Sequence, residues 1–146
     1  SVSRGLGDVY KRQVMKNLGV KRALIVYGDD GLDEISISST TSVCEIDGDE
    51  IKGYTIDPEE LGLTLAKKED IVGGTADENA IITKDILTGK EQGAKRDIVL
   101  LNAGAALYTI GKAETIKDGV KLAAEMIDSG KANEKLEQFI AYTNVK

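Results

Sequence analysis

The chain has 146 residues, of which 41% are hydrophobic, and it carries a formal net charge of −6 at pH 7. This length is enough for one domain with a substantial core, and the acidic charge argues against a nucleic-acid-binding face, which needs clustered basic residues. Histidine is absent, which excludes Ser-His-Asp and Cys-His catalysis, His-containing zinc sites and imidazole acid–base chemistry.

The sequence has one cysteine, Cys44, so an internal disulfide cannot form. Cys44 lies in a predicted strand, where a small buried hydrophobic role is more typical than nucleophilic chemistry. The sequence shows no secretory apolar segment and no stretch long enough to span a membrane. These features predict a cytoplasmic protein with no nucleic-acid or membrane partner, whose chemistry rests on carboxylate, hydroxyl, lysine and backbone groups.

Residues 1–13 differ in character from the sequence that follows. They are basic and polar, contain two glycines and lack apolar positions at helical spacing. We predict that they are a non-native tail fused where the native sequence stops, with a native start as the alternative.

The first predicted strand covers residues 21–27 and follows a helix end that Gly19 closes. Its apolar run at 23–26 is typical of a strand buried on both faces in a parallel α/β sheet. Ligands of such sheets bind outside the carboxyl ends of the strands, which places Asp33 and Glu34, one turn later, near the expected site. Carboxylates are ligands that Mg²⁺ prefers, although acidic residues after a strand are more often solvated loop charges.

Three further short strands are predicted, at 35–38, 42–46 and 51–56. Residues 35–38 alternate between apolar and polar, as a half-buried strand does. Asp47, Gly48 and Asp49 predict a hairpin between the last two strands, because glycine tolerates a positive φ. The fold class is therefore α/β, with a partial sheet of short strands followed by a helical C-terminal half.

The second half of the sequence is predicted to be helical. Thr75 and Glu78 have the spacing of a capping box, and Gly89 is predicted to end the helix that they begin. The next helix, at 96–110, is rich in alanine and glycine, which favours close packing against a neighbour. Asn102 within it is predicted to be a buried polar residue satisfied by the backbone, with support of a site as the alternative. Two more helices follow, one capped by Thr115 and one after the Ser-Gly pair at 129–130.

Five ordered segments resemble the C-terminal part of anthranilate phosphoribosyltransferases, enzymes of tryptophan biosynthesis. The resemblance runs from about Val14 to about Tyr142 and covers only part of a family member. The segments are Gly-Leu-Asp-Glu-Ile-Ser at 31–36, Tyr-Thr-Ile-Asp-Pro-Glu-Glu-Leu-Gly-Leu at 54–63, Gly-Gly at 73–74, Glu-Asn-Ala at 78–80, and Lys-Arg-Asp-Ile-Val-Leu-Leu-Asn-Ala-Gly-Ala-Ala-Leu-Tyr at 95–108.

The resemblance implies a glycosyltransferase that moves phosphoribosyl from phosphoribosyl pyrophosphate to anthranilate. Asp33 and Glu34 match the family's acidic pair that holds Mg²⁺ at the phosphoribosyl substrate. No catalytic residue is assigned in this chain, because the main phosphoribosyl pyrophosphate and anthranilate sites lie upstream in the family. The resemblance therefore implies that residues 14–146 are the C-terminal part of the α/β domain, that the isolated fragment is inactive, and that a homodimer forms only with the full-length chain.

One departure from the family pattern is Tyr27, at a position where family members often carry histidine. Tyrosine can donate a hydrogen bond and stack, but it is not cationic at neutral pH. Two other interpretations stay open: a relative of the pyrimidine-nucleoside phosphorylases, against which the residues at 31–36 argue, and a non-catalytic α/β module that binds a partner.

Overall fold

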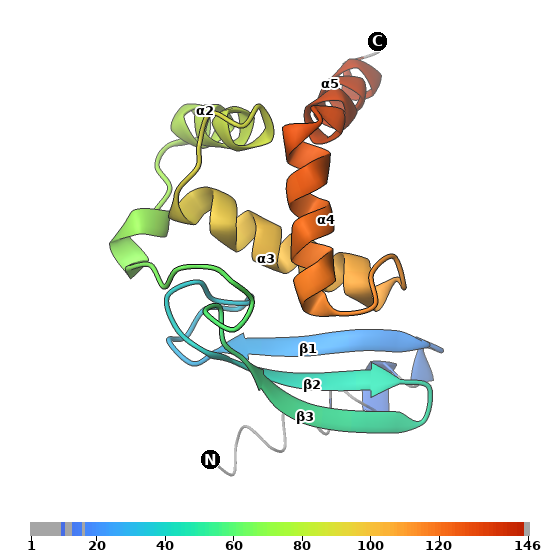
Figure 1. Cartoon of the computed structure of the whole chain (residues 1–146). Helices are drawn as coiled ribbons and strands as arrows, with labels where there is room; N and C mark the ends of the chain where they lie inside the picture. The colour runs from blue at the N-terminus through green and yellow to red at the C-terminus, as the bar shows by residue number, and fades with distance from the viewer. Residues whose placement is uncertain (1–9, 11–12, 16, 145–146) are drawn as a thin grey trace.

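The computed structural model describes residues 10, 13–15 and 17–144. The predicted tail at 1–13 falls outside the described residues, apart from positions 10 and 13. Figure 1 shows one layer of three strands with α3 and α4 on one side of it, and α2 and α5 farther from the sheet. The elements are β1 (Arg22–Gly28), β2 (Thr41–Asp47), β3 (Glu50–Ile56), the 3-10 helix η1 (Lys68–Ile71), α2 (Ala76–Leu87), α3 (Ala94–Thr109), α4 (Ile116–Asp128) and α5 (Lys131–Thr143).

The sheet is antiparallel, with the strand order β1-β2-β3. The predicted hairpin is confirmed: Asp47 pairs with Glu50, and Gly48 between them has a φ of +59°. The parallel pairing suggested by the apolar run of β1 is wrong for these residues. A parallel partner needs a crossover segment, usually a helix, whereas the chain between β1 and β2 is a loop that returns directly alongside β1.

The predicted strand at 35–38 is also wrong, because these residues lie in the loop between β1 and β2. Ile35, Ser36 and Ile37 are all buried, so the alternation of residue types does not reflect one buried and one solvated face. Side chains satisfy the backbone in place of a neighbouring strand: the Ser36 amide donates to Thr41 Oγ1 at 2.9 Å, and the Ile35 amide donates to Asn102 Oδ1 at 3.0 Å.

The predicted helices in the second half are confirmed, with boundaries shifted by one or two residues. The Thr75 amide donates to Glu78 Oε2 at 2.7 Å, and the Glu78 amide donates to Thr75 Oγ1 at 3.3 Å, so α2 begins with a capping box. The backbone turns out of α2 at Gly89, which has a φ of +74°. Thr115 caps α4 by accepting from the Asp118 amide at 3.1 Å.

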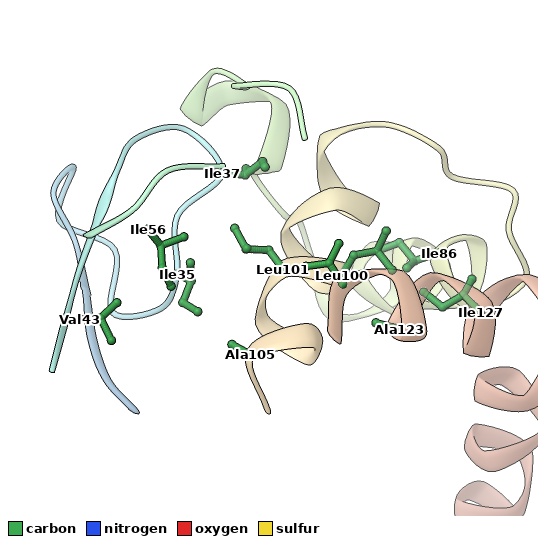
Figure 2. Close-up of a cluster of buried hydrophobic side chains, with 11 residues drawn as sticks. Ile35, Ile37, Val43, Ile56, Ile86, Leu100, Leu101, Ala105, Ala123 and Ile127 are labelled. Carbon is green, nitrogen blue, oxygen red and sulfur yellow. The ribbon is translucent and has the colours of Figure 1, made fainter. Parts of the chain in front are cut away.

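The core runs from the sheet through α3 to α4 (Figure 2). On the sheet side it contains Val43 and Ile56 from β2 and β3 and Ile35 from the loop. On the helical side, the backbones of α3 and α4 meet at Gly104 and Gly119, where a β-carbon on either residue would overlap the other helix. This contact confirms that the alanine- and glycine-rich sequence of α3 serves close helix packing.

Some apolar surface is left uncovered by the described residues. Only one edge of β1 has a strand partner among them. A groove of about 450 Å³ runs between β1 and α3, and another of about 370 Å³ lies among α2, α3, α4 and α5. Ile110, which is 68% exposed, lines both grooves. None of the helices described has the length and apolar character needed to span a membrane.

We expect the purified chain to self-associate, because an open strand edge next to uncovered apolar grooves favours intermolecular contact. Replacing Ile110 by asparagine should weaken this association, since the side chain lies at the junction of both grooves. Sedimentation velocity over a range of protein concentrations measures the effect.

The control for this substitution is Ile81→Asn. Ile81 is 61% exposed on α2 and lines neither groove. This variant should associate as the unmodified chain does. A chain that stays monomeric and unfolds cooperatively at all concentrations would contradict the prediction.

Candidate functional site

Asp33 and Glu34 lie in the loop that follows the carboxyl end of β1, and both side chains are exposed. This is the placement that the sequence predicts for them. Neither carboxylate makes a hydrogen bond or ion pair with another described residue. The pair is therefore accessible to a cation from solvent and has oxygen atoms available to bind it.

The two charges are close enough to interact. Partial burial raises the pKa of Glu34 above its ordinary value, and the negative charge of Asp33 raises it further. A divalent cation beside the pair would offset this repulsion and favour the ionised form of Glu34. A bound cation would therefore stabilise both carboxylates in their ionised form.

Asp30 organises the loop on the side nearer β1. Its carboxylate accepts from Ser36 Oγ at 2.8 Å, from Ser38 Oγ and from the Leu32 amide at 3.3 Å. Burial alone would raise the pKa of Asp30, but these hydrogen bonds, led by those from Ser38 and Ser36, lower it below its ordinary value. Lys68 donates to the Asp30 carbonyl, which ties the loop to η1. A network of polar contacts therefore holds the loop in place beside β1.

Asn102 of α3 holds the loop on its other side. Its Oδ1 accepts from the Ile35 amide at 3.0 Å, and its Nδ2 donates to the Ile35 carbonyl at 2.9 Å and to the Ile98 carbonyl at 3.0 Å. The prediction that the backbone satisfies Asn102 is confirmed. Its main partner is not its own helix but the residue that follows Glu34.

A second polar cluster, which the sequence analysis missed, lies between the sheet and α3. Glu45 of β2 is 6% exposed and accepts from Tyr108 at 2.7 Å, Tyr54 at 3.0 Å and Arg22 at 3.2 Å. The Arg22 guanidinium also stacks over the Tyr108 ring, 4.1 Å from its centroid. One signal could have indicated this cluster: Glu45 shares the inward face of β2 with Val43, because strand side chains alternate with period two.

Two other features of the sequence, the single cysteine and the pair of glycines before α2, have structural explanations. Cys44 is a free, half-buried residue of β2, consistent with the predicted packing role. The two glycines before α2 are exposed, and Asn79 satisfies the Gly74 backbone by accepting from its amide at 2.8 Å and donating to its carbonyl at 3.0 Å. This segment is therefore the entry to a capped helix.

The donor set of the loop fits a magnesium ion held jointly with a substrate. No cluster of three or more Asp, Glu, Cys or His side chains with metal-binding geometry occurs in the part of the chain that the structure describes. Mg²⁺ commonly takes one or two carboxylates and completes its coordination with water and phosphate oxygens. Asp33 and Glu34 match that pattern, whereas a protein-only cation cage would need more ligands.

Comparison with known proteins places this architecture in a family. An anthranilate phosphoribosyltransferase of Methanobrevibacter smithii is 58% identical over 132 residues, which are 90% of this chain and 39% of that protein. The crystal structure of the enzyme from Thermus thermophilus superposes with a TM-score of 0.80 at 38% identity, covering 90% of this chain and 38% of that one. The Saccharomyces cerevisiae enzyme in complex with PRPP and Mg gives a TM-score of 0.74 at 32% identity over 81% of this chain and 34% of that one.

The chain spans about two-fifths of the length of the curated relatives that it matches. The sequence pattern of the glycosyl transferase family α/β domain matches residues 6–133. With the matching fold and these relatives, the chain belongs to the glycosyl transferase family that includes the anthranilate phosphoribosyltransferases.

Proposed function

We propose that this chain is part of an anthranilate phosphoribosyltransferase and contributes the carboxylate pair that holds Mg²⁺ at phosphoribosyl pyrophosphate. The observation that carries the proposal is the exposed pair Asp33 and Glu34, free of protein partners among the described residues, at the carboxyl end of β1. The S. cerevisiae relative solved with PRPP and Mg supports the choice of ligand. Residues 14–146 are proposed to be the C-terminal part of the α/β domain.

The proposed reaction joins the anomeric carbon of the phosphoribosyl group to the amine of anthranilate and breaks its bond to pyrophosphate. When bound, Mg²⁺ stabilises the negative charge that develops on the pyrophosphate oxygens. In this scheme Asp33 and Glu34 hold the cation and do not transfer protons. The rest of the enzyme supplies the remaining substrate contacts, and the homodimer is proposed only for the complete protein.

Two other functions are less well supported. The named relatives are anthranilate phosphoribosyltransferases rather than pyrimidine-nucleoside phosphorylases, the alternative with phosphate as acceptor. A non-catalytic module would not need an exposed carboxylate pair on a loop tied down from both sides. An open reading frame upstream that encodes a glycine-rich, pyrophosphate-binding loop would favour the enzyme over the module.

The proposal is tested in a complete enzyme made by joining this chain to the part of the M. smithii relative that it does not match. The double substitution Asp33→Asn and Glu34→Gln should raise the Mg²⁺ concentration needed for half-maximal activity about tenfold or more and slow turnover, because the cation loses its protein ligands. Steady-state rates measured across a Mg²⁺ titration give both quantities.

The matched control is Glu59→Gln with Glu60→Gln, which removes the same charge from two adjacent exposed residues on another loop. Its magnesium titration should match that of the unmodified enzyme. If the double substitution at 33 and 34 leaves the titration and the rate unchanged, the pair has no role in metal binding.

We expect the isolated 146-residue chain to have no phosphoribosyltransferase activity and to bind Mg²⁺ only weakly. Two carboxylates without a bound diphosphate provide few ligands for a cation that gives up its water reluctantly. Incubation of the purified chain with anthranilate, phosphoribosyl pyrophosphate and Mg²⁺ tests this. Formation of phosphoribosyl anthranilate would contradict the prediction.

A further inference from the structure

The backbone is anchored immediately before and immediately after the carboxylate pair. Before it, the Leu32 amide donates to Asp30 Oδ1 at 3.3 Å, and the Leu32 carbonyl accepts from the Gly28 amide at 3.0 Å. After it, both backbone polar groups of Ile35 bind the Asn102 side chain. Only Asp33 and Glu34 lie between the two anchors.

The second anchor, which Asn102 makes with Ile35, is rigid because both residues belong to well-packed parts of the fold. Asn102 lies in the middle of the 16-residue helix α3, which also packs against α4. Its Nδ2 bond to the Ile98 carbonyl at 3.0 Å fixes the orientation of the amide within the helix. Ile35, which receives the anchor, is itself 2% exposed in the core. The peptide that joins Glu34 to Ile35 is thus held against a helix that packs into the core.

We propose that Asn102 is a positioning residue that presents Asp33 and Glu34 to the cation, while Asp30 anchors the backbone before the pair. The inference rests on the proposed magnesium role of the pair and adds a residue, 67 positions away from Ile35, that does not touch the metal. Without the anchor, the backbone at Asp33 and Glu34 would be more mobile before binding and would lose more conformational entropy when the carboxylates bind a cation. Fixing the ligands in advance removes that cost, as outer-shell partners do at other metal sites.

The test uses the ¹⁵N-labelled 146-residue chain and Mn²⁺ as the probe, because a paramagnetic ion broadens amide signals near it even when binding is weak. Mn²⁺ should broaden the Asp33 and Glu34 amides of the unmodified chain, and Mg²⁺ should reverse the effect. Asn102→Ala should raise the apparent Kd for Mn²⁺ about tenfold and speed hydrogen exchange of the Ile35 amide. This substitution changes no charge, so a weaker affinity cannot come from altered long-range attraction.

The control is Leu100→Ala, which removes a buried side chain from the same helix, away from the loop backbone. It should lower the unfolding midpoint but leave the Kd for Mn²⁺ within about twofold, because folded molecules retain both anchors. If Asn102→Ala does not fold, Asn102→Gln keeps the amide but displaces it by one methylene, and it should also weaken binding.

The outcomes separate the two proposals. Wild-type affinity for Mn²⁺ in a folded Asn102 variant overturns the positioning role and leaves the metal role of the pair intact. Absence of Mn²⁺ broadening at Asp33 and Glu34 in the unmodified chain overturns the metal role and, with it, the function of the anchor. An equal loss of affinity in Leu100→Ala would show that general destabilisation, not positioning, causes the effect.

Discussion

Replacing Gly119 by alanine should destabilise the chain by about 3 kcal/mol, the largest effect that we expect from adding a single methyl group. The added β-carbon would overlap the Gly104 carbonyl oxygen and would lie 2.8 Å from the Gly104 carbonyl carbon. Both neighbours are backbone atoms, so no side chain can rotate away, and α3 and α4 must move apart. The higher helix propensity of alanine recovers only about 1 kcal/mol of the loss.

The measurement is the free energy of unfolding from urea denaturation followed by circular dichroism. Gly53→Ala is the matched control, because a β-carbon there would meet only the Val43 carbonyl oxygen, at 3.9 Å. That variant should be as stable as the unmodified chain or slightly more so, since alanine loses less backbone freedom than glycine on folding. A Gly119→Ala chain with an unchanged midpoint would show that the two helices do not pack backbone to backbone.

Replacing Glu45 by glutamine should cost about 2 kcal/mol of stability at neutral pH, because it leaves the Arg22 charge without its buried partner. The side chain of Glu45 is 8% exposed and that of Arg22 is 26% exposed, so the loss should be smaller than for a fully buried pair. Glutamine keeps the size of the side chain: its oxygen can still accept from Tyr108, and its amide group can donate to the Tyr54 hydroxyl, which accepts in place of donating. The variant therefore removes the charge while leaving both tyrosines a hydrogen-bond partner.

The pH dependence of this effect has a definite sign. Burial alone would raise the pKa of Glu45, but hydrogen bonds from Tyr108, Tyr54 and Arg22, together with the Arg22 charge, lower it below its ordinary value of 4.5. A carboxyl group whose pKa is lower in the folded state stabilises the fold above its unfolded pKa and loses that contribution as the pH falls through its folded pKa. The stability difference between the unmodified chain and Glu45→Gln should be constant above about pH 5 and shrink below about pH 4.

Urea denaturation at a series of pH values measures this difference. Glu50→Gln is the control, since Glu50 is 74% exposed in its pair with Lys52 and such surface pairs contribute little to stability. Its stability should follow that of the unmodified chain at every pH. A Glu45→Gln difference that grows on acidification would mean that the pKa of Glu45 is raised, not lowered, in the fold.

Features that depend on neighbours in the sequence could be predicted from the sequence alone. The capping box of Thr75 and Glu78, the turn at Gly48 and the end of α2 at Gly89 each involve residues within a few positions of one another. The exposure of Asp33 and Glu34 after β1 belongs to the same class, because a polar turn directly after an apolar strand lies at the surface. These are local rules of backbone geometry and solvation, and a single sequence contains them in full.

Tertiary structure decided the features whose partners are distant in the sequence. Residues 35–38 have the alternation of a strand, but Asn102 and Thr41 bind their backbone amides, so the segment stays a buried loop. Glu45 has the sequence context of an ordinary strand residue, and only the packing of α3 brings Tyr108, 63 positions later, within 2.7 Å of it. Hydrogen-bonding groups accept any partner with suitable geometry, and which partner is within reach depends on how the helices pack against the sheet.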